Sequence, residues 1–113
     1  GLGWISGHVV KISTGQGVRV PHVGWNQIQA NPSCAIFSRT GEKPHVYFDH
    51  SYHLFCQPSL IAATTEYGRT IVAAIQQENI FGVQFHPEKS QNNGLRMYRD
   101  FFDFVHLEEH THA

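Results

Sequence analysis

A histidine and a glutamate on either side of one proline could carry acid–base chemistry. His86 ends an apolar stretch, Pro87 interrupts it, and Glu88 follows. Proline has no N–H to give to a sheet, so the strand should stop here. A carboxylate beside an imidazole holds the ring in one tautomer and stabilises its charged form. The sequence therefore predicts His86 and Glu88 as a catalytic base and the residue that orients it.

Such a pair still needs a nucleophile, and the chain offers only poor candidates. Neither Cys34 nor Cys56 is flanked by the glycines that a strained nucleophile turn requires. Both are better interpreted as small buried hydrophobic residues. The hydroxyl of Ser51 is also a weak candidate. We expect no nucleophile among these 113 residues.

Nine histidines raise the alternative of a metal site, but most are scattered. Only His106, His110 and His112 cluster, and an i, i+4 pair on a helix can bind zinc. A frayed terminus is the favoured interpretation, so residues 106–113 are predicted to be a flexible tail. Neither a metal nor an organic cofactor is predicted.

Composition indicates one globular domain. The 113 residues are 41% hydrophobic and 15% charged, with a formal net charge of -1, and they suffice for a single core. Without a basic block, nucleic acid is not expected as a partner. No apolar run approaches the roughly 20 residues that span a bilayer. The two cysteines form no dense disulfide pattern, which favours a cytoplasmic location.

Short apolar and β-branched runs between turn residues predict a strand-rich fold. We expect a turn at 67–70 and another at 77–79. Residues 31–33 should form a turn or cap a short helix, and the strand at 46–48 should be accessible at an edge and lead to a polar site. The predicted strands are residues 8–12, 18–20, 46–48, 60–67, 70–76 and 80–85.

One helix is predicted at the C-terminal end, over residues 94–105. Its apolar residues are spaced by three, four and seven, which indicates one buried face that includes the aromatic stripe Tyr98, Phe101 and Phe102. The predicted fold class is α/β, a mixed or antiparallel sheet with this helix packed on it.

Three ordered motifs resemble the class I glutamine amidotransferases, and in particular the histidine-biosynthesis branch that serves imidazole glycerol phosphate synthase. Residues 82–90 have the sequence Gly-Val-Gln-Phe-His-Pro-Glu-Lys-Ser, residues 20–26 Val-Pro-His-Val-Gly-Trp-Asn, and residues 47–52 Tyr-Phe-Asp-His-Ser-Tyr. The resemblance covers nearly the whole chain. Related amidotransferases of sugar biosynthesis remain an alternative.

The resemblance implies that residues 1–105 are the C-terminal half of an amidotransferase domain. In this family a cysteine attacks the glutamine side chain, helped by the histidine and glutamate that match His86 and Glu88. The ammonia passes to a cyclase subunit. Ser51 and Tyr52 match a wall of the glutamine site. The residues that match the cyclase-docking face are Pro21, His22, Trp25, Asn26, Tyr47, His50 and Lys89.

Two departures from the family pattern shape the functional expectation. The family's cysteine turn and glycine-rich loop would fall before Gly1, and Asp49 stands at a usually apolar position. The chain alone is therefore predicted to be inactive. Three readings stay open: an inactive fragment, a half-enzyme completed by a second chain, or a non-catalytic module that binds the cyclase. An open sheet edge would favour pairing with itself or with a complementary piece.

Overall fold

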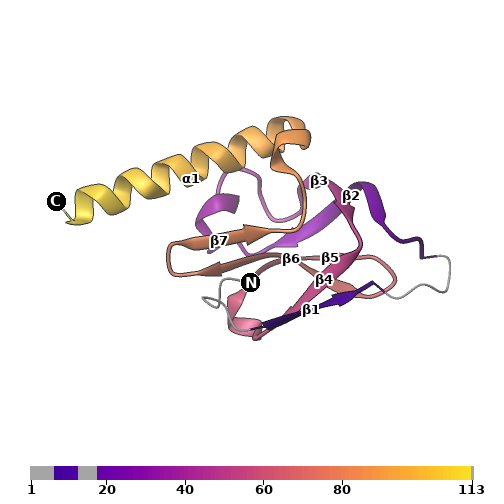
Figure 1. Ribbon diagram of the computed structural model, residues 1–113. Helices are drawn as coiled ribbons and strands as arrows, with labels where there is room; N and C mark the ends of the chain where they lie inside the picture. The colour runs from indigo at the N-terminus through magenta and orange to yellow at the C-terminus, as the bar shows by residue number, and fades with distance from the viewer. Residues whose placement is uncertain (1–6, 13–17, 113) are drawn as a thin grey trace.

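The computed structural model describes residues 7–12 and 18–112, with side chains for residues 9–12 and 18–106. Within these ranges the chain forms strands, short 3₁₀ helices and one α-helix (Figure 1). The helical elements are η1 (Ala35–Phe37), η2 (Pro58–Leu60), η3 (Pro87–Lys89) and α1 (Gln91–His112). The strands are β1 (Gly7–Lys11), β2 (His22–Ala30), β3 (His45–His50), β4 (Tyr52–Cys56), β5 (Ile61–Glu66), β6 (Thr70–Gln77) and β7 (Ile80–Val83).

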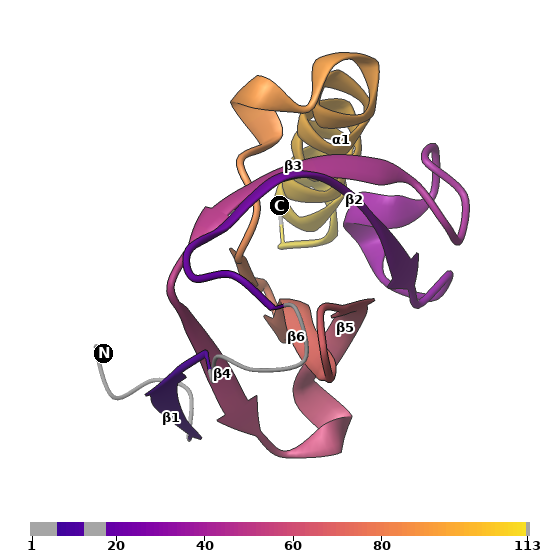
Figure 2. The same ribbon diagram turned by 90° about the vertical axis from the view of Figure 1, so that its right-hand side faces the viewer.

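Five strands form an antiparallel sheet in the order β3-β2-β5-β6-β7, and β1 pairs with β4 separately. The sheet is curled, as Figure 2 shows. Just beyond β7, Phe85 forms an isolated bridge with Phe48 of β3, and the N–H of His86 donates to the carbonyl of Tyr47 at 2.8 Å. The chain that leaves one edge of the sheet therefore meets the opposite edge strand.

The core fills the inside of this curl. Its members come from β2, η1, β3, β5 and β6 as well as the segments around Phe85 and Met97. Helix α1 packs on η1 and η3, and buried Asp100 accepts hydrogen bonds from the Ser38 hydroxyl at 2.9 Å and from the Arg39 N–H at 3.0 Å. In the described part of the chain, no helix has the length and apolar character needed to cross a membrane.

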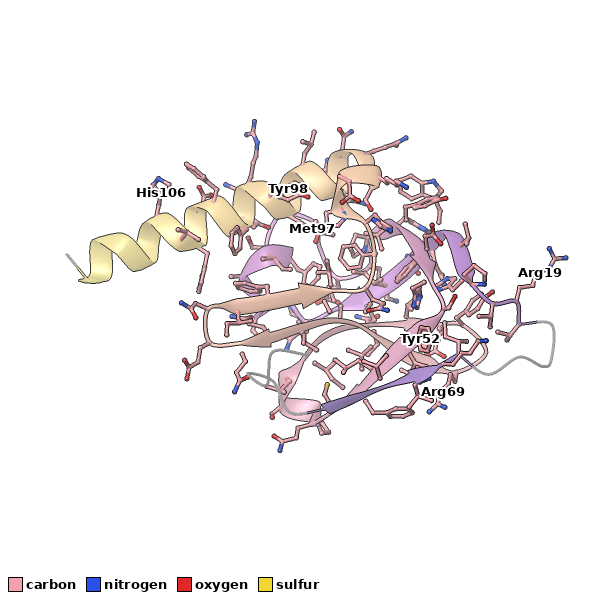
Figure 3. All side chains as sticks on the ribbon, viewed as in Figure 1. Arg19, Tyr52, Arg69, Met97, Tyr98 and His106 are labelled. Carbon is pink, nitrogen blue, oxygen red and sulfur yellow. The ribbon has the colours of Figure 1, made fainter. Side chains whose placement is uncertain are left out.

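Helix α1 buries only part of the face that periodicity predicted. Met97 is 4% exposed, but Tyr98 is 51% and Phe102 59% exposed; Figure 3 labels Met97 and Tyr98 on the helix. The inner face instead uses Gly94, whose hydrogen atom faces the carbonyl of Pro87, and hydrogen-bonded Asp100. The interpretation of Tyr98, Phe101 and Phe102 as helix core is therefore wrong, although Phe101 does touch Phe81 edge-on.

Most predicted strands are confirmed, at 8–12, 46–48, 60–67 and 70–76, and β3 lies at a sheet edge as expected. The predicted strand 18–20 is wrong, because Val18 makes only an isolated bridge. Strands β2 and β4 were not predicted. The inward positions of β2 begin with His22, Gly24 and Asn26, so its first half lacks the apolar alternation that signals a strand.

Candidate active site

His86 and Glu88 meet where β7 gives way to η3. Pro87 is the first residue of η3 and His86 is its N-cap. Strand β7 covers residues 80–83 of the predicted strand 80–85, so His86 lies three residues beyond its end and directly after the bridge at Phe85. The Nδ1 atom of His86 lies 2.6 Å from Oε1 of Glu88. The two side chains are 38% and 54% exposed, which leaves the pair open to a reactant.

The carboxylate of Glu88 is held in its charged form. Its own backbone N–H and the ring of His86 donate hydrogen bonds to it, and together they lower the pKa of Glu88. Since Nδ1–H of His86 donates to Glu88, Nε2 carries the free lone pair. In the described part of the chain Nε2 makes no hydrogen bond, so this nitrogen is available as a proton acceptor.

Ser90 fastens this segment to the sheet. The Ser90 hydroxyl donates to the His86 carbonyl at 2.6 Å and accepts from the Tyr47 N–H at 3.0 Å, and Ser90 is only 1% exposed. Sequence reasoning assigned no role to Ser90, although it is the last residue of the family motif at residues 82–90. The backbone of His86 is thereby held against β3 through the side chain of Ser90.

Neither cysteine has the features of a nucleophile. Cys34 is part of the core, and Cys56 lies at the end of β4. Burial raises the pKa of both thiols, whereas the reactive form of cysteine is the thiolate. Within the described chain, the side chain of His86 has Glu88 as its hydrogen-bond partner and no thiol.

Four of the seven predicted docking residues lie at the surface or reach it. Trp25 is 49% exposed and meets Tyr47 edge-on with ring centroids 6.1 Å apart. The Lys89 ammonium lies 5.7 Å from the centroid of the Tyr47 ring, a cation–π contact. We call these three residues the Trp25–Tyr47–Lys89 row; it ends next to Glu88, and Pro21 is also exposed.

The structure removes His22 and His50 from that surface. His22 is 3% and His50 9% exposed, because the two rings face each other across β2 and β3 and His22 is stacked between Phe48 and Tyr67. Asn26 is half-buried and reaches His22. The structure thus places these three residues against one another in the fold, and their contact with a partner stays a prediction.

Ser51 and Tyr52 lie at the bend between β3 and β4, and Tyr52 is 52% exposed. In the described part of the chain no hydrogen bond joins either of them to His86. The connection runs through Gln84, whose Nε2 donates to the Tyr52 carbonyl at 2.8 Å. Sequence reasoning missed Gln84, although it stands two residues before His86 in the motif.

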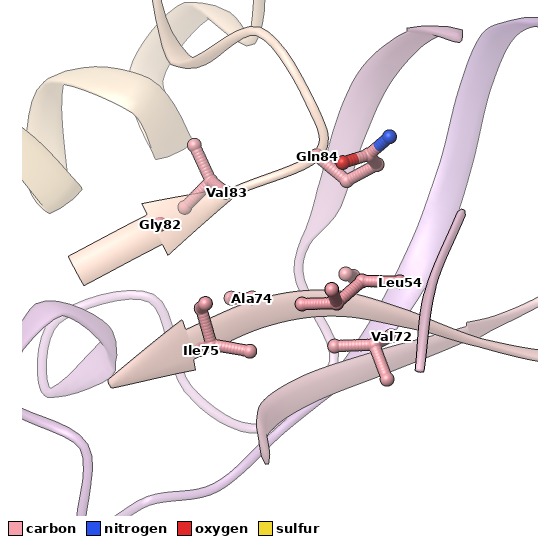
Figure 4. A pocket seen from close by; sticks show the side chains of 8 residues that line it. Leu54, Val72, Ala74, Ile75, Gly82, Val83 and Gln84 are labelled. Carbon is pink, nitrogen blue, oxygen red and sulfur yellow. The ribbon is translucent and has the colours of Figure 1, made fainter. Parts of the chain in front are cut away.

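A shallow apolar hollow lies beside Gln84 (Figure 4). It carries no charged or nucleophilic side chain, so it offers no chemistry of its own. Its lining residues are Leu54, Val72, Ala73, Ala74, Ile75, Gly82, Val83 and Gln84.

Metal binding finds no support in the part of the chain that the structure describes. No three histidine, cysteine, aspartate or glutamate side chains there converge on one point. The side chains of His110 and His112 lie outside the described residues.

Comparison with known proteins gives one consistent family. Residues 4–105 match the family Glutamine amidotransferase class-I. The chain is 48% identical over 103 residues to the imidazole glycerol phosphate synthase subunit HisH of Pyrococcus furiosus, covering 89% of this chain and 52% of that protein. It is 44% identical over 109 residues to subunit HisH 2 of Vibrio vulnificus, covering 96% and 51%.

A solved structure supports the same fold. The crystal structure of a putative GMP synthase protein from Thermoplasma acidophilum superimposes with a TM-score of 0.73 over 95% of this chain and 53% of its own, at 21% identity. The chain spans about half the length of the curated relatives it matches.

Proposed function

The chain belongs to the class I glutamine amidotransferase family, and on that premise we propose that it supplies the histidine–glutamate half of a glutamine-hydrolysing site in imidazole glycerol phosphate synthase. The observation that carries the proposal is the 2.6 Å contact between His86 and Glu88. The relatives named HisH, at 39% to 48% identity, support the histidine-pathway branch over others.

The proposed reaction uses a cysteine from a segment outside these 113 residues. Nε2 of His86 takes the thiol proton while the sulfur attacks the side-chain amide carbon of glutamine. His86 returns that proton to the departing nitrogen, which leaves as ammonia and a thioester remains. His86 then takes a proton from water as the oxygen attacks the thioester, the carbon–sulfur bond breaks to release glutamate, and His86 returns the proton to the departing thiolate. Glu88 stabilises the imidazolium at each stage.

The substrate and partner contacts are part of the same proposal. Ser51 and Tyr52 form a wall of the glutamine site, and glutamine is the substrate. The Trp25–Tyr47–Lys89 row, with Pro21, docks on the cyclase subunit that receives the ammonia. Asn26, His22 and His50 support these surfaces from within the sheet.

Complementation tests the proposal. The chain would be mixed with the half of the Pyrococcus furiosus relative that it does not cover, and glutamate formation from glutamine would be measured. We expect turnover from the mixture and none from this chain alone. His86→Asn should lower the rate about 10³-fold or more and Glu88→Gln about 10²-fold, the range for losing a general base and its orienting group.

The matched control is His106→Asn, because His106 is exposed and its ring bonds only to its own helix, at the Phe102 carbonyl. That variant should keep full activity. Equal rates for the His86→Asn and parent mixtures would refute the proposal. Dependence on Cys34 or Cys56, tested by changing each to alanine, would show that the nucleophile lies within this chain.

A binding role without catalysis is the second candidate. It is favoured by the Trp25–Tyr47–Lys89 row, which is complete within this chain, whereas the catalytic triad is not. Three results together would establish it: calorimetry shows binding to the cyclase subunit, Trp25→Ala abolishes that binding, and no mixture of the two halves turns over glutamine. Self-association through a sheet edge is a further proposal, and a clean monomer in light scattering at micromolar concentration would contradict it.

A cytoplasmic location completes the proposal. The two cysteines are free, as is usual for thiols kept in a reducing compartment.

A further inference from the structure

We propose that Asn26, His22 and His50 form a one-way hydrogen-bond relay that sets the position of the Tyr52 carbonyl group. All three are positioning residues, since the reaction proposed above assigns no chemical step to any of them. Only the predicted effect on turnover rests on that proposed function. The relay itself requires only that His22 and His50 each carry the ring proton on Nδ1.

The direction of the relay is decided at Asn26. Its Oδ1 accepts from the Gln27 N–H at 2.8 Å, and its Nδ2 donates to the Glu66 carbonyl at 3.1 Å. These two bonds leave one orientation for the side-chain amide. Nδ2 also lies 3.3 Å from Nε2 of His22. Because an amide nitrogen only donates, Nε2 of His22 must be the acceptor and carries no proton.

The consequence passes from ring to ring. A neutral imidazole without a proton on Nε2 has one on Nδ1. Nδ1 of His22 lies 2.9 Å from Nε2 of His50, so His22 donates and His50 accepts. His50 then bears its own proton on Nδ1, which lies 2.8 Å from the Tyr52 carbonyl oxygen. Nδ1 of His50 also lies 3.2 Å from Nε2 of Gln84, but that amide donates to the Tyr52 carbonyl at 2.8 Å. Because a carbonyl oxygen only accepts, the shorter contact to Tyr52 assigns Nδ1 of His50 as a donor. Asn26 thereby selects the tautomer of both histidines.

The surroundings hold the rings in place and uncharged. His22 is stacked between Phe48 and Tyr67, with centroid distances of 4.5 Å and 3.9 Å. Burial, and then the neighbouring His50, lower the pKa of His22 to about 4. Burial likewise lowers the pKa of His50. At neutral pH the only freedom left to the pair is the choice of tautomer.

The far end of the relay lies beside the candidate active site. The Tyr52 carbonyl also accepts from Nε2 of Gln84 at 2.8 Å, and Gln84 precedes His86 by two residues. One carbonyl oxygen therefore joins the β3–β4 bend, with Ser51 and Tyr52, to the segment that bears the catalytic base. Displacing that oxygen should move the proposed glutamine wall relative to His86.

The decisive measurement is the ¹⁵N NMR spectrum of the histidine rings in the 113-residue chain at neutral pH. We expect His22 and His50 both to show a protonated Nδ1 and an unprotonated Nε2. A protonated Nε2 on either ring would overturn the relay.

Two variants on adjacent residues test the coupling to Tyr52. Asn26→Ala removes the donor that selects the tautomers, whereas Gln27→Ala removes a side chain that bonds outward to the Lys43 carbonyl. We expect the Tyr52 carbonyl ¹³C resonance to shift in Asn26→Ala and to stay unchanged in Gln27→Ala. Thermal unfolding curves would verify that both variants are folded. An unchanged resonance in Asn26→Ala would refute the positioning role.

In the complemented enzyme, Asn26→Ala should raise KM for glutamine about tenfold with kcat within about twofold, the pattern of lost substrate positioning. If KM is unchanged in Asn26→Ala while His86→Asn still abolishes turnover, the link between the relay and the substrate is refuted and the proposed function stands. If no mixture turns over, the proposed function fails while the NMR results still decide the relay.

Discussion

The side chain of Ser90 bonds the carbonyl of His86 to the opposite edge of the sheet, donating at 2.6 Å to His86 and accepting at 3.0 Å from the Tyr47 N–H. Ser90→Ala would leave both backbone groups without this partner. Because Ser90 is buried, we expect a loss of about 1–3 kcal/mol in the free energy of unfolding, measured in urea. Ser59→Ala, at an exposed position, should change it little. Equal stability of the two variants would contradict this role.

Gly94→Ala should destabilise the protein although alanine is the better helix former. Helix propensity favours alanine over glycine by about 1 kcal/mol. A Cβ at position 94, however, would lie 1.8 Å from the Pro87 carbonyl oxygen, a backbone atom in η3. We expect the steric overlap to outweigh the gain in helix propensity, so that Gly94→Ala lowers the free energy of unfolding by about 2 kcal/mol net. The overlap should also displace η3, and Glu88 with it. Asn92→Ala, exposed in the same helical turn, is the control, and a gain in stability for Gly94→Ala would refute the argument.

Two aspartates that bind the same arginine should differ in their effect on stability. Asp100 has a side chain 1% exposed and accepts from Ser38 as well as Arg39, whereas Asp103 is 59% exposed and binds only Arg39. Asp100→Ala removes a buried carboxylate that accepts from the Ser38 hydroxyl, the Arg39 N–H and the Arg39 guanidinium, and should cost about 2–3 kcal/mol. Asp103→Ala should cost under about 1 kcal/mol. Similar unfolding midpoints would show that α1 is not anchored through Asp100.

Stability should fall as the medium becomes acidic, through His22 and His50. Both pKa values lie below their ordinary value, and that of His22 falls from 6.5 to about 4. The unfolded chain therefore binds more protons in this window, so stability is fully present above pH 6.5 and is lost as the pH falls toward 4. For His22 the loss is on the order of 3 kcal/mol.

Two contacts oppose the lowering of the pKa of His50, first its hydrogen bond to the Tyr52 carbonyl and then the charge of Asp49. The pKa of the neighbouring His53 is itself lowered, by burial, by Arg69 and by His50. Urea unfolding from pH 7.5 to pH 4.5 would measure the effect. His22→Gln should flatten the slope, and His106→Gln should keep it. The same slope in both variants would count against His22 as the source.

Much of the candidate site was predictable because it is local. Pro87 is the one residue between His86 and Glu88, so the meeting of their side chains depends on backbone geometry near one turn. The β5–β6 hairpin is also local. Gly68 takes φ 73° in its turn, a conformation that glycine adopts at no steric cost. The family motifs lie on these same short segments, which is why the sequence alone indicated the family.

Only the tertiary structure decided which residues lie between the elements. His22 and His50 are 28 positions apart and meet because β2 and β3 pair in that register. Ser90 and Tyr47 are 43 positions apart and meet because the sheet curls until its two edges come together. The same closure turns Gly94, Met97 and Asp100 of α1 inward and leaves Tyr98 and Phe102 outside. Periodicity shows that a helix has an apolar stripe, but the inward face is selected by close approach and buried hydrogen bonds with distant segments, which no local pattern contains.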